Sequence, residues 1–255
     1  MDDAHKWLKD NQIDVPGIRP YQKEAIESIE AAIFANKRKL LLGMATGTGK
    51  TFTAAELIYR LLKSKTAKRI LFLVDRRALA AQAIRDFASF EPEPAQKLDK
   101  LYEVYSQKFR REDLSADGGF DPHILPPDYL TNPKSNHTFV YVCTIQRMRI
   151  YLFGRQGVFP WTEEDNYEED VDKLDNIPVH AFDFVIADEC HRGYTAGEES
   201  KWREVLNHFD AVKIGLTATP AKHATVFRGG YIPIPCSPSR SRRIFSRLGS
   251  SSDKF

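Results

Sequence analysis

Apolar runs and amphipathic stretches alternate along the chain. Six short apolar runs predict β-strands, at residues 39–44, 69–75, 100–106, 138–144, 182–188 and 211–218. Between them, apolar residues recur at helical spacing over three stretches, at residues 52–64, 77–90 and 200–209. Continuous apolar strands that alternate with amphipathic helices are typical of a parallel β-sheet with helices on both faces. The pattern therefore predicts an α/β fold, and a mixed α+β domain is the alternative.

Three segments depart from this alternation. Residues 111–137 carry Gly-Gly, Pro-Pro and Asn-Pro pairs, which predict a long surface loop. An acidic insertion at 160–178 contains eight acids and one lysine within residues 163–175. This charge predicts a solvated segment, with partner binding as the alternative. Residues 228–255 are rich in serine and arginine and show no periodicity, so we expect an irregular tail, with nucleic-acid contact as the alternative.

Composition places the chain among globular proteins. Of its 255 residues, 42% are hydrophobic and 28% are charged. No apolar run approaches the roughly 18 to 20 residues that a membrane span needs, and the polar N-terminus does not resemble a secretory signal. We therefore expect a cytoplasmic protein with no membrane partner.

The cysteines argue against a disulfide framework and a zinc site, and the net charge gives little information on nucleic-acid binding. The three cysteines, Cys143, Cys190 and Cys236, are odd in number and widely spaced. That spacing argues against a disulfide framework and against a zinc site built on paired cysteines. The formal net charge of +2 gives no global argument for nucleic-acid binding, so a surface of that kind must be local.

The strongest chemical motif is GMATGTGKT at residues 43–51, between the first predicted strand and a predicted helix. Glycines in this context let backbone N–H groups turn toward phosphate oxygens at a helix N-terminus. Lys50 then reaches the β- and γ-phosphates, and the Thr51 hydroxyl binds Mg²⁺. Met44 stands where the strict pattern has glycine, but the inner part is intact: Thr46, Gly47, Thr48, Gly49, Lys50 and Thr51. The alternative is a glycine-rich turn that only resembles a phosphate loop.

Gln22 precedes the phosphate loop, within IRPYQKEAI at residues 18–26, and we expect it to lie before an amphipathic helix. Its amide offers a donor and an acceptor, which is what selection of an adenine edge requires. By itself it is an ordinary polar helix residue. The weight of Gln22 as evidence for adenine binding depends on the other motifs.

A second polar group, Asp188 to His191, ends the apolar run 182–188. A magnesium–nucleotide site needs a carboxylate at the carboxyl end of a parallel strand, next to the phosphate-loop strand. Asp188 meets that need, and Glu189 is the candidate that polarises the attacking water. Adjacent residues of an extended segment point to opposite faces, so Cys190 and His191 are poorly placed to chelate one zinc ion. A cysteine–histidine nucleophile has no evident third group to orient it.

The segment TATP at residues 217–220 follows the predicted strand 211–218. Hydroxyls of Thr217 and Thr219 at a strand end are able to link a nucleotide site to a neighbouring surface through hydrogen bonds. A simple proline-terminated turn is the alternative. The position of TATP one strand after the acidic pair favours the coupling role.

Taken together, these motifs resemble the motor domains of superfamily 2 (DEAD/DEAH-type) helicases and translocases, and within them the R subunits of type I restriction enzymes. The resemblance covers residues 18–223 and rests on six segments in order: RPYQ, MATGTGKT, FLVDRRALAAQA, TIQRM, FDFVIADECHR and KWREVLNHFDAVKIGLTATPAKH. It implies a RecA-like (P-loop) domain that uses ATP and Mg²⁺. It also implies double-stranded DNA as a partner, with the methylation and specificity subunits of a restriction complex.

The resemblance assigns roles residue by residue. It implies that Gln22 reads adenine, that Lys50, Asp188 and Glu189 are catalytic, and that Thr51 and Asp188 hold the metal. The residues implied to couple ATP to DNA are His191, Thr217 and Thr219. Those implied to contact the sugar-phosphate backbone are Arg76, Arg77, Thr144 and Arg147; such contacts are largely independent of sequence. For Arg76 and Arg77, an exposed helix start is the alternative.

The expected domain organisation follows from these motifs. Residues 1–17 are a lead-in, residues 18–227 a first RecA-like ATP-binding motor domain, and residues 228–255 the tail. We expect a fragment truncated before a second motor domain, with weak nucleotide binding and little DNA-stimulated hydrolysis as an isolated chain. Two alternatives remain: a fragment of another DEAD/DEAH-type DNA or RNA helicase, or a nucleotide-gated binding module without hydrolysis.

Overall fold

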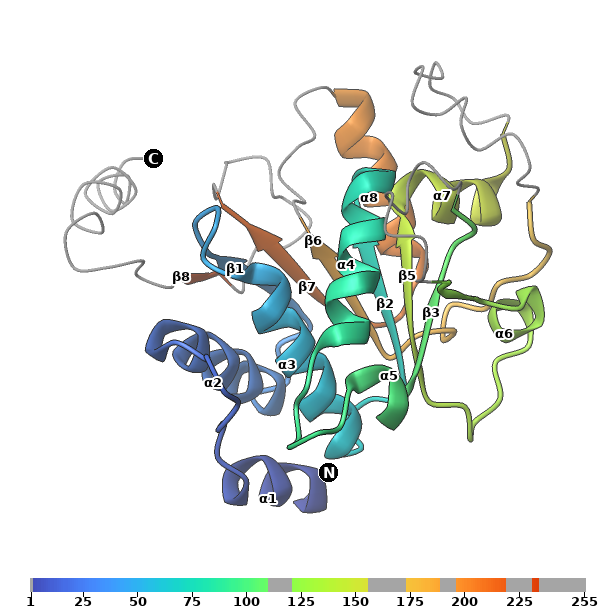
Figure 1. The fold of residues 1–255 in the computed structure, drawn as a ribbon. Helices are drawn as coiled ribbons and strands as arrows, with labels where there is room; N and C mark the ends of the chain where they lie inside the picture. Colours follow the sequence, from blue (N-terminus) through green and yellow to red (C-terminus); the bar gives the residue numbers. More distant parts are fainter. Residues whose placement is uncertain (1, 110–120, 156–172, 189–195, 219–230, 234–255) are drawn as a thin grey trace, which may run out of the picture.

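The structure, a computed structural model, describes residues 2–109, 121–155, 173–188, 196–218 and 231–233 (Figure 1). Its centre is one sheet of eight strands in the order β4-β3-β5-β2-β6-β7-β1-β8, and every neighbouring pair is parallel. The strands are β1 (Lys39–Gly43), β2 (Arg69–Val74), β3 (Glu103–Ser106), β4 (His123–Ile124), β5 (Phe139–Thr144), β6 (Phe184–Asp188), β7 (Val212–Thr217) and β8 (Tyr231–Pro233). The α/β fold with a parallel sheet is thus confirmed.

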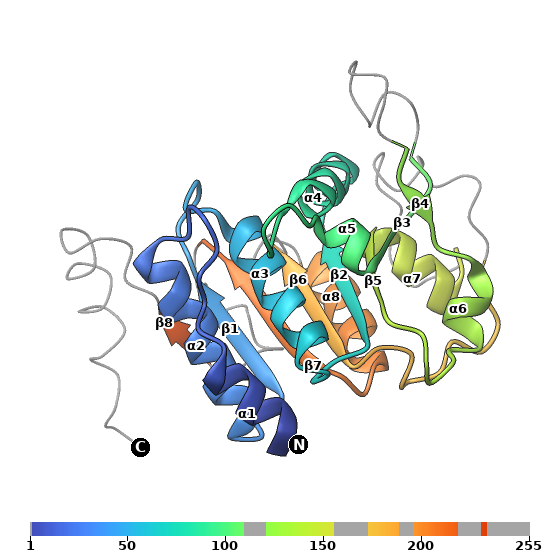
Figure 2. The same cartoon turned by 60° about the horizontal axis from the view of Figure 1, so that its bottom comes forward.

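Eight helices are described, and the longer ones cover both faces of the sheet (Figures 1 and 2). They are α1 (Asp2–Asp10), α2 (Pro20–Phe34), α3 (Lys50–Lys63), α4 (Arg77–Ser89), α5 (Leu98–Leu101), α6 (Pro127–Thr131), α7 (Ile145–Phe153) and α8 (Ala196–His208). One hydrophobic cluster joins one face of the sheet to α2, α3 and α4. A second cluster joins the opposite face to α7 and α8.

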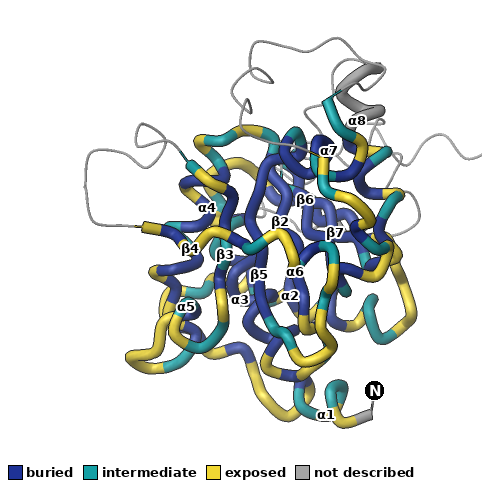
Figure 3. Tube along the Cα trace, turned by 90° about the vertical axis from the view of Figure 1, so that its right-hand side faces the viewer, coloured by how far each residue is buried: buried dark blue, intermediate teal, exposed yellow. Residues whose placement is uncertain are grey.

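The alternation of side chains along each strand builds these two clusters. In β2, Ile70 and Phe72 belong to the first cluster, whereas Leu71 and Leu73 belong to the second. Because successive strand residues point to opposite faces, a strand covered on both faces must be apolar throughout. All six residues of β2 are buried, as are those of β5, and Figure 3 shows both strands in the buried centre of the molecule.

Most of the predicted strands and helices are found within one or two residues, but the run at 100–106 is an exception. Residues Leu98–Leu101 form the short helix α5, and β3 begins only at Glu103. The buried Leu98, which is 0% exposed, anchors this turn to the first cluster. Tertiary packing therefore overrides the apolar run.

Two segments expected to be irregular carry secondary structure. The predicted loop 111–137 contains β4 and α6, whose Leu130 is 2% exposed and packs into the second cluster. In the predicted tail, β8 pairs in parallel with β1 and forms the edge of the sheet. The domain boundary expected after residue 227 therefore separates β8 from the sheet to which it belongs.

Residues 1–17 were expected to be a lead-in, and the described part of this segment, residues 2–17, is packed against the domain. In α1 and the segment that follows it, Leu8, Ile13 and Val15 are at most 6% exposed. The Arg60 side chain on α3 donates hydrogen bonds to the carbonyl oxygens of Leu8 (3.0 Å) and Asn11 (2.8 Å). These bonds satisfy carbonyls that the end of α1 leaves without helical partners.

Candidate functional site

The site lies at the carboxyl edge of the sheet, where β1, β7 and β6 end side by side. Their register places Gly43 opposite Thr217 and Asp188 opposite Leu216. We expected the strand of Asp188 to lie next to the phosphate-loop strand, and this expectation is wrong because β7 lies between them. Asp188 nevertheless lines the same cleft as Lys50 and Thr51.

The turn between β1 and α3 has the backbone geometry that its glycines predict. Gly47 and Gly49 have φ angles of +75° and +80°, in the region that favours glycine. Thr48 closes the turn, because its hydroxyl donates to the Ala45 carbonyl oxygen at 2.7 Å. Helix α3 begins directly after Gly49, with Lys50 as its first residue. The first-turn N–H groups of α3 therefore face the mouth of the loop, where an anion is favoured.

Met44, which replaces the usual glycine, has a structural role. Its side chain is 1% exposed and belongs to the first hydrophobic cluster. Its backbone N–H donates to the Thr217 carbonyl oxygen at 2.8 Å. This hydrogen bond fixes the start of the phosphate loop to the end of β7. The hydrophobic core accommodates the Met44 side chain at the position where the usual pattern has glycine.

Gln22 lies within the first turn of α2 rather than before the helix, so that part of the expectation is wrong. Its side chain is 3% exposed, and the amide oxygen accepts a hydrogen bond from the Arg19 N–H at 2.8 Å. The amide nitrogen donates to the carbonyl oxygens of Thr48 at 3.0 Å and Gly49 at 3.3 Å. Gln22 therefore supports the phosphate loop through these hydrogen bonds. Its role in reading adenine stays a prediction.

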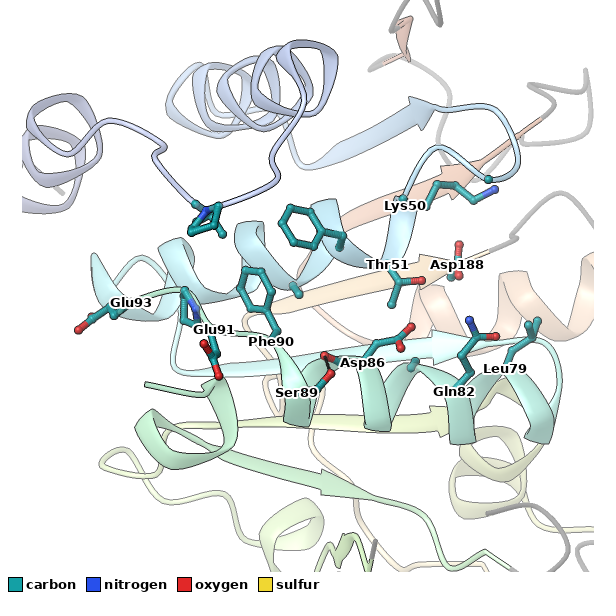
Figure 4. A pocket seen from close by; sticks show the side chains of 18 of the residues that line it. Lys50, Thr51, Leu79, Gln82, Asp86, Ser89, Phe90, Glu91, Glu93 and Asp188 are labelled. Atoms are coloured by element: carbon teal, nitrogen blue, oxygen red, sulfur yellow. Dashed lines mark hydrogen bonds between the residues drawn. The ribbon is translucent and has the colours of Figure 1, made fainter. Parts of the chain in front are cut away.

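A cleft of about 1170 Å³ runs from the phosphate loop along the groove between α3 and α4 (Figure 4). Lys50, Thr51 and Asp188 lie at one end, and Glu93 lies at the other. Further lining residues come from three segments: Val15 and Pro16, Phe52 and Ala55, and Leu79, Gln82, Asp86 and Phe90. The volume exceeds the upper end of typical small-molecule pockets, which is about 1,000 Å³.

The charges of the cleft are separated along its length. Lys50, which is 9% exposed, brings a positive charge to the phosphate-loop end. On α4, partial burial raises the pKa of Asp86, opposed by the neighbouring Arg85 and by a hydrogen bond with Gln82. At the far end, hydrogen bonds from Lys63 and Tyr59 lower the pKa of Glu93. An anion is therefore favoured beside Lys50 and disfavoured toward Glu93.

The donor atoms at the phosphate-loop end suit a hard cation. Thr51 offers a hydroxyl and Asp188 a carboxylate, and Mg²⁺ prefers oxygen ligands of this kind, completed by water and substrate phosphates. Among the described residues no group of three or more histidine, cysteine, aspartate or glutamate side chains is placed to hold a metal alone. The residues therefore fit a metal that arrives with a phosphate ligand. Glu189, His191 and Thr219 lie outside the described residues.

The predicted nucleic-acid residues come from two neighbouring strand ends, because Val74 of β2 is paired with Thr144 of β5. Arg76 directly precedes α4 and Arg77 is its first residue; the Arg76 side chain is 54% exposed. Thr144 and Arg147 are instead 1% and 7% exposed. The Thr144 hydroxyl caps α7 by accepting the Arg147 N–H at 3.2 Å, and Arg147 lies over the Tyr151 ring. Their contact with DNA stays a prediction.

The sequence predictions missed most of the cleft wall. Val15 and Pro16 belong to the segment taken as a lead-in, which has no motif. On α4, Gln82, Asp86 and Ser89 line the cleft from one side of the helix. Their spacing of four and three residues is the signal that marks a shared helix face.

The family described as Type III restriction enzyme, res subunit, matches residues 16–222 of the chain. The chain is 32% identical over 242 residues to the Type I restriction enzyme EcoKI endonuclease subunit of Escherichia coli (strain K12), covering 88% of this chain and 17% of that protein. It is also 32% identical over 218 residues to the EcoAI endonuclease subunit of Escherichia coli, covering 85% of this chain and 21% of that protein.

A solved structure has the same fold. It is a nuclease-deletion mutant of the Type ISP restriction-modification enzyme LlaGI in complex with a DNA substrate mimic, with a TM-score of 0.53 and 23% identity. The match covers 89% of this chain and 20% of that chain, and it confirms the expected RecA-like fold. Among the described residues, no helix is long and apolar enough to cross a membrane. The chain spans about a fifth of the length of these proteins.

Proposed function

The chain belongs to the family described as Type III restriction enzyme, res subunit, and from this premise we propose that it is an ATP-binding motor domain. In this proposal it couples ATP hydrolysis to translocation along double-stranded DNA, as part of the R subunit of a type I restriction enzyme. The methylation and specificity subunits of such a complex are its protein partners.

One observation carries the proposal: the phosphate loop and Asp188 meet at one end of a single cleft. Lys50 and Thr51 come from the start of α3, and Asp188 comes from the end of β6, two strands away in the sheet. Residues separated by more than a hundred positions thus provide a cation, a hydroxyl and a carboxylate within one cavity. This combination is what binding of a magnesium–triphosphate requires.

Each residue has a role in that site. The first-turn N–H groups of α3 and the turn at Gly47 and Gly49 bind the phosphate oxygens, and Lys50 neutralises the β- and γ-phosphates. Thr51 and Asp188 hold Mg²⁺, which when bound draws charge from the phosphates. Glu189, the next residue along the chain, orients the attacking water. Gln22 keeps the loop in its binding conformation and selects adenine.

The coupling to DNA is assigned to residues at the same edge. Thr217 is 0% exposed and its carbonyl oxygen accepts the Met44 N–H, which links β7 to the phosphate loop. Thr217, Thr219 and His191 transmit the state of the nucleotide to the DNA surface. Arg76 and Arg77, with Thr144 and Arg147 of the neighbouring strand end, hold the DNA backbone.

Steady-state ATP hydrolysis by the purified chain, with and without duplex DNA, tests the proposal. We expect slow turnover that requires Mg²⁺, rises only slightly with duplex DNA and is lost in Lys50→Ala. Loss in Asp188→Asn, with ATP still bound, assigns that carboxylate to the metal. Turnover that is absent in the presence of DNA, while ATP still binds, would instead identify a binding module without hydrolysis. Stimulation by RNA alone would identify another kind of helicase domain.

A further inference from the structure

The amino ends of β1 and β7 carry two lysines side by side, at the edge of the sheet opposite the phosphate loop. Lys39 of β1 is the register partner of Lys213 of β7, and the two strands are parallel. The Lys213 N–H donates to the Arg38 carbonyl oxygen at 2.8 Å, which fixes this end of the strand pair. Neighbouring strands lie about 4.8 Å apart. The two lysine side chains therefore start from adjacent points of the sheet.

Both lysines lie on the face of the second hydrophobic cluster. Leu41, two residues after Lys39, belongs to that cluster, whereas Ile214, next to Lys213, belongs to the first. Because side chains alternate along a strand, Lys39 and Lys213 share the face of Leu41. They differ in depth: Lys39 is exposed, and Lys213 is only 8% exposed. One cation of the pair is thus accessible to solvent, and the other is buried.

The nearest carboxylate does not neutralise this pair. Asp210 is the acid that raises the pKa of Lys213, but its Oδ1 forms an ion pair with the Arg38 guanidinium at 2.6 Å. Neither Lys39 nor Lys213 makes a side-chain hydrogen bond or an ion pair with another residue that the structure describes. Two positive charges therefore meet at this point of the sheet without a counter-ion from the described part of the chain.

This arrangement is costly unless an anion binds. Burial lowers the pKa of Lys213, and the cations Lys39 and Arg38 lower it further. Desolvation and like charge both oppose the charged form of a lysine, and like charges directly opposite each other on neighbouring strands are destabilising. An apolar side chain of similar length at position 213 would avoid both effects. A bound anion would convert the repulsion into attraction.

The charge of the pair indicates the kind of anion. Two ammonium groups are neutralised by a dianion, whereas a single carboxylate or a phosphodiester leaves one positive charge over. A phosphate monoester carries about −1.5 to −2 charges near neutral pH and has three strong acceptor oxygens. Lysine is a common phosphate ligand because its ammonium group is a compact point charge with three donors. A phosphate dianion therefore fits the pair.

We propose that Lys39 and Lys213 form a binding site for a phosphate dianion, either inorganic phosphate or the phosphate group of a small monoester. The bound ion joins the amino ends of β1 and β7, the strands whose other ends carry the phosphate loop and Thr217. The site is separate from the cleft of the proposed ATP site, whose lining includes neither lysine. It does not depend on the proposed function.

The test is urea denaturation of the full chain in inorganic phosphate and in chloride of equal ionic strength, at a pH above the second pKa of phosphate. Phosphate also suits the phosphate loop, so the readout is the difference between the wild type and Lys213→Met. In chloride the variant should be the more resistant to urea, because it lacks the repulsion. At a phosphate concentration of about ten times the Kd, the folded-to-unfolded ratio of the wild type should rise about tenfold relative to that of the variant.

Three controls accompany this comparison. Lys39→Met should lose the phosphate response as Lys213→Met does, and it decides alone if Lys213→Met does not fold, because Lys39 is exposed. Lys37→Met is the matched control: it removes an exposed lysine two residues earlier, outside the paired strands, and should keep the wild-type response. Acetate, with one charge, should stabilise the wild type and the variants equally.

An equal response to phosphate in the wild type, Lys39→Met and Lys213→Met would overturn the inference. So would an acetate response that matches the phosphate response. Weaker binding of a short DNA duplex by both variants, with an unchanged response to phosphate, would assign the lysines to the DNA backbone and overturn it as well. A wild-type chain that binds no ATP but shows the phosphate difference would remove the proposed function and leave this site standing.

Discussion

At the scale of single residues, the contact between Gly49 and Gln22 is the tightest constraint on the phosphate loop. A Cβ atom on Gly49 would lie 2.6 Å from the Gln22 Nε2, and its φ is +80°. We expect Gly49→Ala to lower the free energy of unfolding by about 1–3 kcal/mol. Chemical denaturation measures this change.

Gly47 is the matched control for this prediction. Its φ is +75°, but a Cβ would have no atom within 4 Å. Gly47→Ala therefore adds conformational strain without a clash, and its loss should be smaller. The double variant Gly49→Ala with Gln22→Ala should recover part of the loss of Gly49→Ala. Equal losses for the two glycines would show that the Gln22 contact does not matter.

Glu56 on α3 predicts a pH dependence of stability. Its side chain is 2% exposed, and its Oε2 has no hydrogen-bond partner in the described residues. Burial raises its pKa from 4.5 to about 8; Arg60 of α3 lowers the pKa, and Glu30 of α2 raises it. The folded state therefore binds a proton that the unfolded state has released between these values. The contribution of Glu56 to stability is present below pH 4.5 and is lost as the pH rises through about 8.

The test compares denaturation of the wild type and Glu56→Gln across this range. As the pH rises, we expect the free energy of unfolding of the wild type to fall relative to that of the variant, by up to about 1.4 kcal/mol per pH unit. Glu93→Gln is the control of opposite sign at lower pH: hydrogen bonds from Lys63 and Tyr59 lower the pKa of Glu93 from 4.5, so its contribution to stability is present above pH 4.5 and is lost as the pH falls below that value. A constant difference between wild type and Glu56→Gln over the whole range would show that Glu56 is ionised in the fold.

At the scale of elements, Arg60 joins three helices. It is 3% exposed and pairs with Glu30 of α2 at 2.6 Å, while its other N–H groups bind the carbonyl end of α1. Burial raises the pKa of Glu30 more than Arg60 lowers it, so removing the cation leaves a costly buried carboxyl. We expect Arg60→Met to lower the free energy of unfolding by about 3–5 kcal/mol. Amide hydrogen exchange in residues 2–10 should become faster.

A double variant separates these two effects. Replacing Arg60 and Glu30 together by methionine removes the buried charges, which is often neutral or stabilising. Global stability should therefore recover, while exchange in α1 stays fast because its carbonyls have lost their donor. Slow exchange in α1 of the double variant would show that apolar packing alone holds this helix.

The elements themselves were largely predictable because strands buried on both faces and amphipathic helices leave strong patterns. Strands β1, β2, β5, β6 and β7 are found at the expected positions, and so are α3, α4 and α8. The short elements were missed for physical reasons. Helix α5 is stabilised by the burial of Leu98, and β8 by pairing with β1, so neither has a periodic signal of its own.

At the scale of the whole molecule, the candidate site was predicted as motifs but not as a cavity. The glycine turn and Asp188 were identified because phosphate and metal binding demand particular residue types. Most of the cleft wall was not, because Val15 and Pro16 reach it only through the docking of the N-terminal segment. The sequence pattern also did not predict the order of the strands, in which β7 separates β1 from β6.

Calorimetric titration with ATP tests whether this cleft binds a magnesium–nucleotide through the phosphate loop. We predict that the wild-type chain binds ATP more tightly with Mg²⁺ than without it. Lys50→Ala should weaken binding by at least about tenfold, and Asp188→Asn should remove the effect of Mg²⁺. Equal affinity of the wild type and Lys50→Ala for ATP would contradict the claim.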